Sequence, residues 1–414
     1  MVDIKLITLS SLLAGQDSSL KDEVYDFLAK LDPDKRINFV DSPKAFPLFV
    51  IASGGSEAKF KAVYKRYPGP YFICPLGNRN SFAASLEIQS FLASKGLKSV
   101  FMNGDDKDAM EYLLSCGRAY SLLKKVKGKR LGLIGGPSDW LIASQCDPRL
   151  VKKKLGIDIV RIPTSELEKE INNQNLGDEK TFFKLRKKTE RLETLRGSLY
   201  IHSALLAIKK KYSIDGFTLR CFDLLDKYQN TSCLAFALLN DAGFTAACEG
   251  DVPSLLTMYL IQALTDKPSF MANPERMDVT HKEAVYAHCT CPFSMGNTYS
   301  LMTHFESGMG FGIRLKLAKQ EVTMVKIAPE LDRVVLKKGK ILNNLEDDDI
   351  CRTQIRVKFE DDISDCLEHP AGNHMIFTYD DVASTLSALM DIVNSWRNTI
   401  PLGMGSLQKG IKVR

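Results

Sequence analysis

Residues 245–264 read TAACEGDVPSLLTMYLIQAL, an apolar strand followed by a turn and an apolar helix. The strand, Thr245–Cys248, ends at two carboxylates, Glu249 and Asp251, and the helix begins at Pro253. Acidic residues and proline are favoured at the start of a helix. A strand joined to a helix by a short turn is the repeating unit of α/β folds with parallel sheets.

The same alternation runs through the chain before this stretch. Apolar runs predict strands, and the segments with helical periodicity between them predict helices. The predicted strands are Ile4–Leu9, Pro47–Ile51, Tyr71–Cys74, Ser99–Met102, Arg130–Ile134, Asp158–Ile162 and Gly216–Cys221, and a long helical pattern covers Glu179–Lys211. A basic stretch with a glycine, KKVKGKR at Lys124–Arg130, separates the first four strands from the rest. We therefore predict two doubly wound parallel-sheet domains, at residues 1–128 and 129–268.

The pattern changes after about Phe270. Short β-like runs separated by turn residues predict a mainly antiparallel region. These runs are Gly310–Leu315, Glu321–Ile327, Val334–Leu342 and Arg356–Phe359, and a last helix is predicted at Asp380–Val393. The predicted fold class is thus α/β, with two parallel-sheet domains followed by a β-rich C-terminal domain at residues 269–414.

Composition limits the class of protein. Of the 414 residues, 44% are hydrophobic and 26% are charged, which is typical of a globular chain. The net charge of +6 is spread thinly and lacks the basic and aromatic clustering of a nucleic-acid surface. No apolar run approaches the ~20 residues that span a bilayer, and the ten scattered cysteines suit reduced thiols in a cytosol. We expect a cytoplasmic protein that binds neither nucleic acid nor a membrane.

Glu249 and Asp251 are candidates for metal binding or acid/base chemistry. In doubly wound folds, ligands bind at the carboxyl ends of the strands, where these two residues are predicted to lie. Two carboxylates at one such end are more than a helix cap requires, although capping remains an alternative.

The histidines add to this candidate site. Five of the six lie in the last third of the chain, including His288 after the apolar run AVYA and His374 after Gly372-Asn373. A single histidine is more often structural than a ligand. Carboxylates from the second domain and imidazoles from the third would together make a mixed oxygen and nitrogen site, which suits Mn²⁺, Fe²⁺, Co²⁺ or Zn²⁺.

Other motifs carry weaker signals. Cys289 and Cys291 have C-x-C spacing, and no second pair stands at zinc-finger spacing. Asn80 and Ser81 follow a predicted strand and could bind a polyol, and Trp140, in a later loop, could stack on a sugar or simply pack. The polar cluster His304–Gly308 fits the wall of an active site and an ordinary β-turn equally well.

The stretch Asn240–Val252, with its helix, resembles the metal-site segment of L-fucose isomerase and its short relatives, in the L-fucose/L-arabinose isomerase superfamily. The similarity continues through Lys267–Met271, Ala287–Pro292 and Gly372–His374, and more weakly through 80–87 and 136–140. That family interconverts aldoses and ketoses through an ene-diol on a divalent metal, usually manganese. Its members have two α/β domains followed by a β-rich one, and they assemble as trimers or hexamers.

The resemblance implies roles for particular residues. Glu249 corresponds to the first metal carboxylate, which is also an acid/base group, and His374 and His288 correspond to histidine ligands. It also implies a divalent metal, Mn²⁺ by preference, a small-molecule sugar substrate and a homo-oligomer.

One residue departs from the family pattern. Asn273 stands where the family has its second metal carboxylate, and an amide can coordinate a metal through its oxygen but cannot act as a general base. Asp251 or Asp278 would then supply the second base, or the reaction would differ. The predicted functions are therefore an aldose–ketose isomerase, an epimerase or lyase that uses the same enolisation, and a non-catalytic sugar- or metal-binding relative.

The candidate residues form three groups. Glu249 and Asp251 are predicted for catalysis; Asn80, Ser81, Trp140 and Asn273 for the substrate; and Glu249, His288 and His374 for the metal.

Overall fold

The computed structural model describes residues 1–14, 18–103, 106–177 and 179–395. The chain forms two compact units. Unit 1 contains Met1–Ser121 and the described residues from Asp391 onward, and unit 2 contains Leu122–Met390. The predicted division at residues 128 and 268 stays a prediction, and residues 396–414 of its third domain lie outside the described part of the chain.

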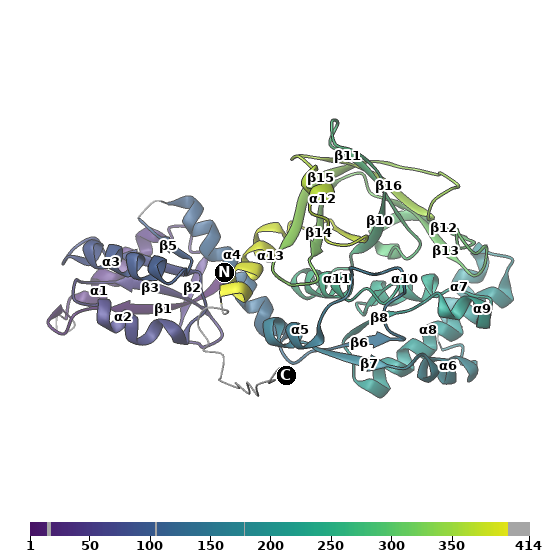
Figure 1. Ribbon diagram of the computed structural model, residues 1–414, viewed down its shortest axis with the longest axis horizontal. Coiled ribbons are helices and arrows are strands. Elements are labelled where there is room, and N and C mark those ends of the chain that lie inside the picture. Colours follow the sequence, from purple (N-terminus) through teal and green to yellow (C-terminus); the bar gives the residue numbers. More distant parts are fainter. Residues whose placement is uncertain (15–17, 104–105, 178, 396–414) are drawn as a thin grey trace, which may run out of the picture. The chain divides into compact units, whose positions relative to one another are not determined.

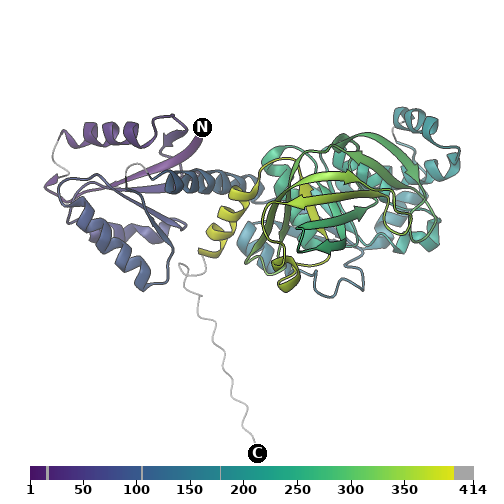
Figure 2. The same cartoon turned by 90° about the horizontal axis from the view of Figure 1, so that it is seen from above.

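Unit 1 is built on a five-stranded parallel sheet in the order β2-β1-β3-β4-β5. Its strands are β1 (Val2–Leu9), β2 (Ile37–Val40), β3 (Phe46–Ile51), β4 (Tyr71–Pro75) and β5 (Ser99–Phe101), and its helices are α1 (Leu20–Leu31), α2 (Glu57–Val63), α3 (Ser81–Ser94) and most of α4 (Lys107–Val126). Helices cover both faces of this sheet (Figure 2). The central strand β3, FPLFVI, is therefore buried along its whole length, as is usual for parallel sheets.

Unit 2 begins with a four-stranded parallel sheet in the order β7-β6-β8-β9. Its strands are β6 (Arg130–Ile134), β7 (Asp158–Ile162), β8 (Gly216–Leu219) and β9 (Thr245–Ala247). The helices between and after them are α5 (Pro148–Leu155), α6 (Thr164–Asn172), α7 (Glu179–Leu185), α8 (Leu192–Tyr212), α9 (Asp223–Tyr228), α10 (Cys233–Asp241) and α11 (Val252–Thr265). The long helix predicted at Glu179–Lys211 is in fact two helices, because a 3₁₀ turn at Arg186–Lys188 ends α7.

The rest of unit 2 is a closed antiparallel barrel with a small additional sheet. The barrel order is β10-β11-β16-β15-β14-β17, and β12 pairs with β13. The strands are β10 (Phe270–Asp278), β11 (Glu283–His288), β12 (Gly296–Met302), β13 (Gly312–Leu317), β14 (Glu321–Ile327), β15 (Val334–Asn344), β16 (Thr353–Phe359) and β17 (Met375–Thr378), with helix α12 (Asp365–Glu368) and the larger part of α13 (Ala383–Ser395). The predicted class, mixed α/β with parallel sheets and a β-rich region, is confirmed.

Helix α11 lies between the parallel sheet and the barrel (Figure 1). It is apolar on all sides, as expected for a helix with neighbours on both sides. The Thr257 hydroxyl accepts a hydrogen bond from the backbone N–H of Ile327 in β14, at 3.1 Å. The start of this helix thus brings the end of β9 close to the barrel. None of the helices among the described residues is long and apolar enough to cross a membrane.

Candidate metal centre

Glu249 lies in the tight turn between β9 and α11. Its backbone has a φ of 62°, a left-handed conformation that is uncommon for a residue other than glycine. Gly250 follows with a φ of 73°, and a Cβ there would lie 2.2 Å from the Gly136 carbonyl oxygen. The Glu249 carbonyl accepts a hydrogen bond from Ser138 N–H at 2.9 Å. The turn is therefore held against the loop that follows β6, which fixes the position of the Glu249 side chain.

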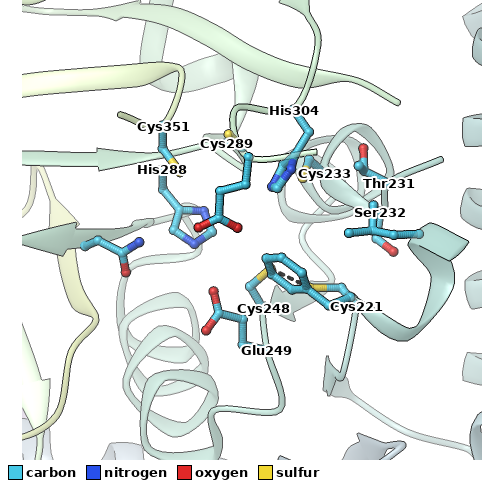
Figure 3. A pocket seen from close by; sticks show the side chains of 14 residues that line it. Cys221, Thr231, Ser232, Cys233, Cys248, Glu249, His288, Cys289, His304 and Cys351 are labelled. Carbon is cyan, nitrogen blue, oxygen red and sulfur yellow. Dashed lines mark hydrogen bonds between the residues drawn. The ribbon is translucent and has the colours of Figure 1, made fainter. Parts of the chain in front are cut away.

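Two histidines from the barrel complete a cluster with Glu249. His288 is the last residue of β11, and His374 immediately precedes β17. All three residues are buried, and each offers a ligand atom within 4.8 Å of the others. Figure 3 shows the side chains of Glu249 and His288 directed toward the same space. One carboxylate and two imidazoles are a donor set that suits divalent first-row metals.

Asp251 contacts His374 at Nδ1, whereas Glu249 lies near Nε2 of the same ring. The fully buried Asp251 carboxylate accepts a hydrogen bond from His374 Nδ1 at 2.8 Å, and it also pairs with Lys326 Nζ at 3.1 Å. Ser254 adds two donors, its N–H and its hydroxyl, both at 2.7 Å. Burial raises the pKa of Asp251, but Lys326 and His374 outweigh it and hold that pKa well below its usual range. The carboxylate is therefore an acceptor, and His374 Nδ1 carries the proton.

When His374 is neutral, this tautomer leaves a lone pair on its other nitrogen. His374 Nε2 is buried, has no hydrogen-bond partner and lies 3.6 Å from Glu249 Oε1. A lone pair facing a carboxylate oxygen is unfavourable unless a cation lies between them. A carboxylate that orients a histidine through Nδ1 is also the usual support for a metal ligand. The residues present therefore fit a divalent metal.

The charge states of two of the ligands, Glu249 and His288, agree with this fit. Burial would raise the pKa of Glu249, but the neighbouring His374 and the Trp140 indole N–H, 2.7 Å from Oε2, lower it to about 2. Burial, with a smaller contribution from His374, lowers the pKa of His288 to about 3. Metal binding requires an ionised carboxylate and neutral imidazoles. Burial lowers the pKa of His374 too, but its contacts with Asp251 and Glu249 raise it overall, so a proton competes with a metal for Nε2.

A cavity of about 510 Å³ opens beside the cluster, in the size range of small-molecule sites. Glu249 and Asn273 form part of its wall together with Trp140, which is 51% exposed. The Asn273 side-chain oxygen is buried and has no hydrogen-bond partner. An inner part of the cavity, which shares Glu249 and Asn273, extends toward His288 and several cysteines.

The other predicted residues have different places. Asp251 does not face the cavity, because its carboxylate is fully enclosed by His374, Ser254 and Lys326. Asp278 is exposed and pairs with His281. Asn80 and Ser81 belong to unit 1, where the buried Ser81 hydroxyl accepts the Gly77 N–H at 3.0 Å. Their role in a sugar site remains a prediction.

Glu275 and Glu306 also line the cavity. In the sequence, Glu306 was noted only as a member of a polar cluster that fits an active-site wall or a β-turn, and Glu275 was not noted. Glu306 lies in the polar cluster His304–Gly308, whose His304 N–H donates to the Met309 carbonyl at 2.9 Å. Burial raises the pKa of both carboxyls, and the charge of Glu249 raises the pKa of Glu306 further. The only indication of Glu306 in the sequence was the polar cluster His304–Gly308, and such a cluster fits an ordinary β-turn equally well.

The fold and the site define a mixed α/β protein with a carboxylate–imidazole cluster between a parallel sheet and a β-barrel. No protein-family model matches the chain. Its curated relatives include proteins named sulfoquinovose isomerase. The one from Priestia aryabhattai is 22% identical over 316 residues, 71% of this chain and 70% of the relative. The one from Clostridium sp. (strain MSTE9) is 28% identical over 200 residues, 44% of each chain.

These relatives are sugar isomerases by name, and they support a sugar isomerase family for this chain. They do not single out the L-fucose isomerase superfamily that the motifs resemble. A third relative of the same name, from Alkalicoccus urumqiensis, is 21% identical over 262 residues and covers 59% of the chain.

Proposed function

We propose that this protein is a metal-dependent aldose–ketose isomerase that acts on a sugar or sugar-like polyol. The observation that carries the proposal is His374 Nε2, which is buried without a hydrogen-bond partner and lies 3.6 Å from Glu249 Oε1, within a cluster that also contains His288. The names of the relatives support the reaction class. The adjoining cavity is large enough for a monosaccharide.

Aldose–ketose exchange needs a proton to move between neighbouring carbons while the carbonyl is polarised. When bound by Glu249, His288 and His374, the metal would act as a Lewis acid toward the carbonyl and the adjacent hydroxyl. Glu249 is the acid/base group, and the Trp140 N–H orients its carboxylate through Oε2. The free oxygen of Asn273 can accept a hydrogen bond from a substrate hydroxyl or serve as a neutral ligand.

Glu306 supplies the second acid/base group in this proposal. Asn273 cannot do so, and Asp251 is enclosed behind His374, where it positions the histidine instead. Glu306 lines both parts of the cavity together with Glu249. A carboxyl with a raised pKa is better matched to proton transfer near neutral pH than an unperturbed one.

Two further parts of the proposal come from the resemblance and not from the site. They are manganese as the preferred metal and a trimeric or hexameric homo-oligomer. A cytoplasmic location is proposed from the ten scattered cysteines, which suit reduced thiols in a cytosol. The partner is a small-molecule sugar and not a nucleic acid.

A second candidate function is an epimerase or lyase that uses the same enolisation, and Asn273 favours it. An amide at this position cannot act as a general base, so the proton transfer that follows enolisation would have to use another group. Incubating candidate sugars in deuterated water separates the two functions. An isomerase yields a ketose labelled at one carbon, whereas an epimerase or lyase yields an inverted aldose or cleaved products.

The proposal is tested by elemental analysis and sugar turnover of the full chain and of Glu249→Gln. We expect about one divalent ion per native chain, which is lost or greatly weakened in the variant together with all measurable turnover. Asp278→Asn is the matched control, because it removes an exposed carboxylate outside the cavity and should keep both metal and activity. Near-native turnover in Glu249→Gln would contradict the proposed role of Glu249. A metal without any enolisation would favour the non-catalytic binding protein.

A further inference from the structure

Half of the ten cysteines line the inner part of the cavity. They are Cys221, Cys233, Cys248, Cys289 and Cys351 (Figure 3), and all of them belong to unit 2. All are free thiols. Among the described residues, the metal-binding geometry is met by Glu249, His288 and His374 and not by these sulfurs. The thiols therefore call for an explanation separate from metal ligation.

Two of these thiols are in direct contact. Cys221 follows β8 and Cys248 follows β9, and these strands are neighbours in the parallel sheet. Their carboxyl ends lie at the same edge, which brings the two Sγ atoms to 3.2 Å. A disulfide bond is about 2.05 Å long, so the sulfurs need to approach by only about 1 Å.

We propose that Cys221 and Cys248 are an oxidisable pair that forms a reversible disulfide when the protein reacts with a hydroperoxide. In the first step, one sulfur attacks the peroxide O–O bond, becomes a sulfenic acid and releases an alcohol or water. In the second step, the other thiol attacks this sulfur, the S–S bond forms and the S–OH oxygen leaves as water. Two thiol hydrogens are lost, and one peroxide is reduced by two electrons.

The disulfide would act on the next residue in the chain. Cys248 precedes Glu249, whose backbone is already in the left-handed region. The Cys248 carbonyl is fixed by the Thr218 hydroxyl at 3.1 Å. With one end of this residue fixed, a pull on its side chain is transmitted to the Glu249 turn. The formation of the disulfide does not depend on the proposed isomerase function, but this effect on the metal rests on the proposed metal site.

The test uses the full chain treated with hydrogen peroxide, followed by blocking of free thiols and peptide mapping by mass spectrometry. We expect a cross-linked species that contains Cys221 and Cys248, lacks two hydrogens and reverts with dithiothreitol. Cys221→Ser should lose this species, and Cys221→Ala is the second variant if serine prevents folding. Cys146→Ser should keep it, because the more exposed Cys146 thiol bonds the Pro329 carbonyl and not another sulfur.

Three results would overturn the proposal. They are a cross-link between Cys289 and Cys351 in place of the expected one, irreversible oxyacids without any cross-link, and a cross-link that forms only in the denatured chain.

The effect on the metal is measured separately, as the Mn²⁺ affinity of the reduced and the oxidised protein. We expect the oxidised protein to bind about tenfold more weakly, the size of effect known for residues that support metal ligands. Equal affinity in both forms would overturn the proposed link between the disulfide and the metal. If the reduced protein binds no Mn²⁺, the proposed metal site fails while the cross-link result stands.

Discussion

Asp251 contributes to the site through His374 and not by contact with a substrate. The expected result of Asp251→Asn is a loss of metal affinity of about 10–100-fold, because the amide orients His374 less strongly than a carboxylate. The same change leaves Lys326 buried without its counter-charge, which costs about 3–5 kcal/mol in the free energy of unfolding. Metal titration and denaturant unfolding measure the two effects.

A double variant separates these two effects of Asp251. Asp251→Asn combined with Lys326→Met removes both buried charges, so it should recover most of the lost stability. Metal affinity should stay low, because His374 still lacks its carboxylate. If affinity recovers together with stability, Asp251 has no separate role in positioning His374.

Glu306 is the residue whose proposed role is most easily separated from metal binding. We expect Glu306→Gln to keep the metal and to lower kcat by about 10²–10⁴-fold, the usual contribution of a general acid or base. Glu275→Gln is the matched comparison, since Glu275 lines the outer cavity but not its inner part. If the rate falls in Glu275→Gln and not in Glu306→Gln, the second acid/base role passes to Glu275.

The roles of Asp251 and Glu306 could not have been predicted from the sequence. Glu249 follows a recognisable strand and precedes a recognisable helix, so its place at a sheet edge was predictable. Asp251 lies beside it, but its partners Lys326 and His374 are 75 and 123 residues away. The position of Glu306 depends on long-range contacts of its loop, in which a Cβ on Gly310 would lie 2.4 Å from the backbone nitrogen of Thr231.

At the scale of an element, the turn between β9 and α11 depends on Gly250. A Cβ there would meet the backbone of Gly136 and Pro137 at 2.2 and 2.5 Å, in addition to the strain of a φ of 73°. Gly128→Ala is the matched control, because its φ of 84° carries the same kind of strain while nothing lies within 4 Å of the added atom. We expect the control to cost about 1–2 kcal/mol.

Gly250→Ala should cost about 3 kcal/mol or more, since overpacking adds to the strain. It should also weaken metal binding, because relief of the clash moves Glu249. Urea unfolding and metal titration of both alanine variants test this. Equal losses of stability in the two variants would show that the Gly136 loop moves aside freely.

The parallel-sheet elements were more predictable than the barrel. Strands such as β3 and β4 are continuous apolar runs because helices bury both of their faces, and such runs are visible in a sequence. The strand β17 has four residues and pairs with both β10 and β14. A run this short predicts a strand but not its two partners, so the antiparallel region was expected while its closure into a barrel was not.

At the scale of the whole molecule, the metal would join two layers of unit 2. Glu249 belongs to the edge of the parallel sheet, and His288 and His374 belong to the barrel. A ligand that binds only the folded state at 100 times its Kd adds about 2.7 kcal/mol of stability. For a unit of this size we expect Mn²⁺ to raise Tm by roughly 5 °C or more.

A chelator should reverse this increase, and Glu249→Gln should abolish it. Asp278→Asn should retain it as the exposed-carboxylate control. An equal increase in Glu249→Gln, measured by thermal unfolding with and without Mn²⁺, would place the bound ion elsewhere on the protein.

The pairing of β17 with β10 also has a consequence for biosynthesis. The barrel closes between its first and its last strand, which are about a hundred residues apart along the chain. During translation, β10 and β14 therefore wait with unpaired edges until β17 has left the ribosome, and His374 emerges only just before it. The last ligand of the metal cluster therefore becomes available at about the time when the barrel can close. Exposed strand edges are prone to intermolecular pairing, so the growing polypeptide is open to aggregation during this interval.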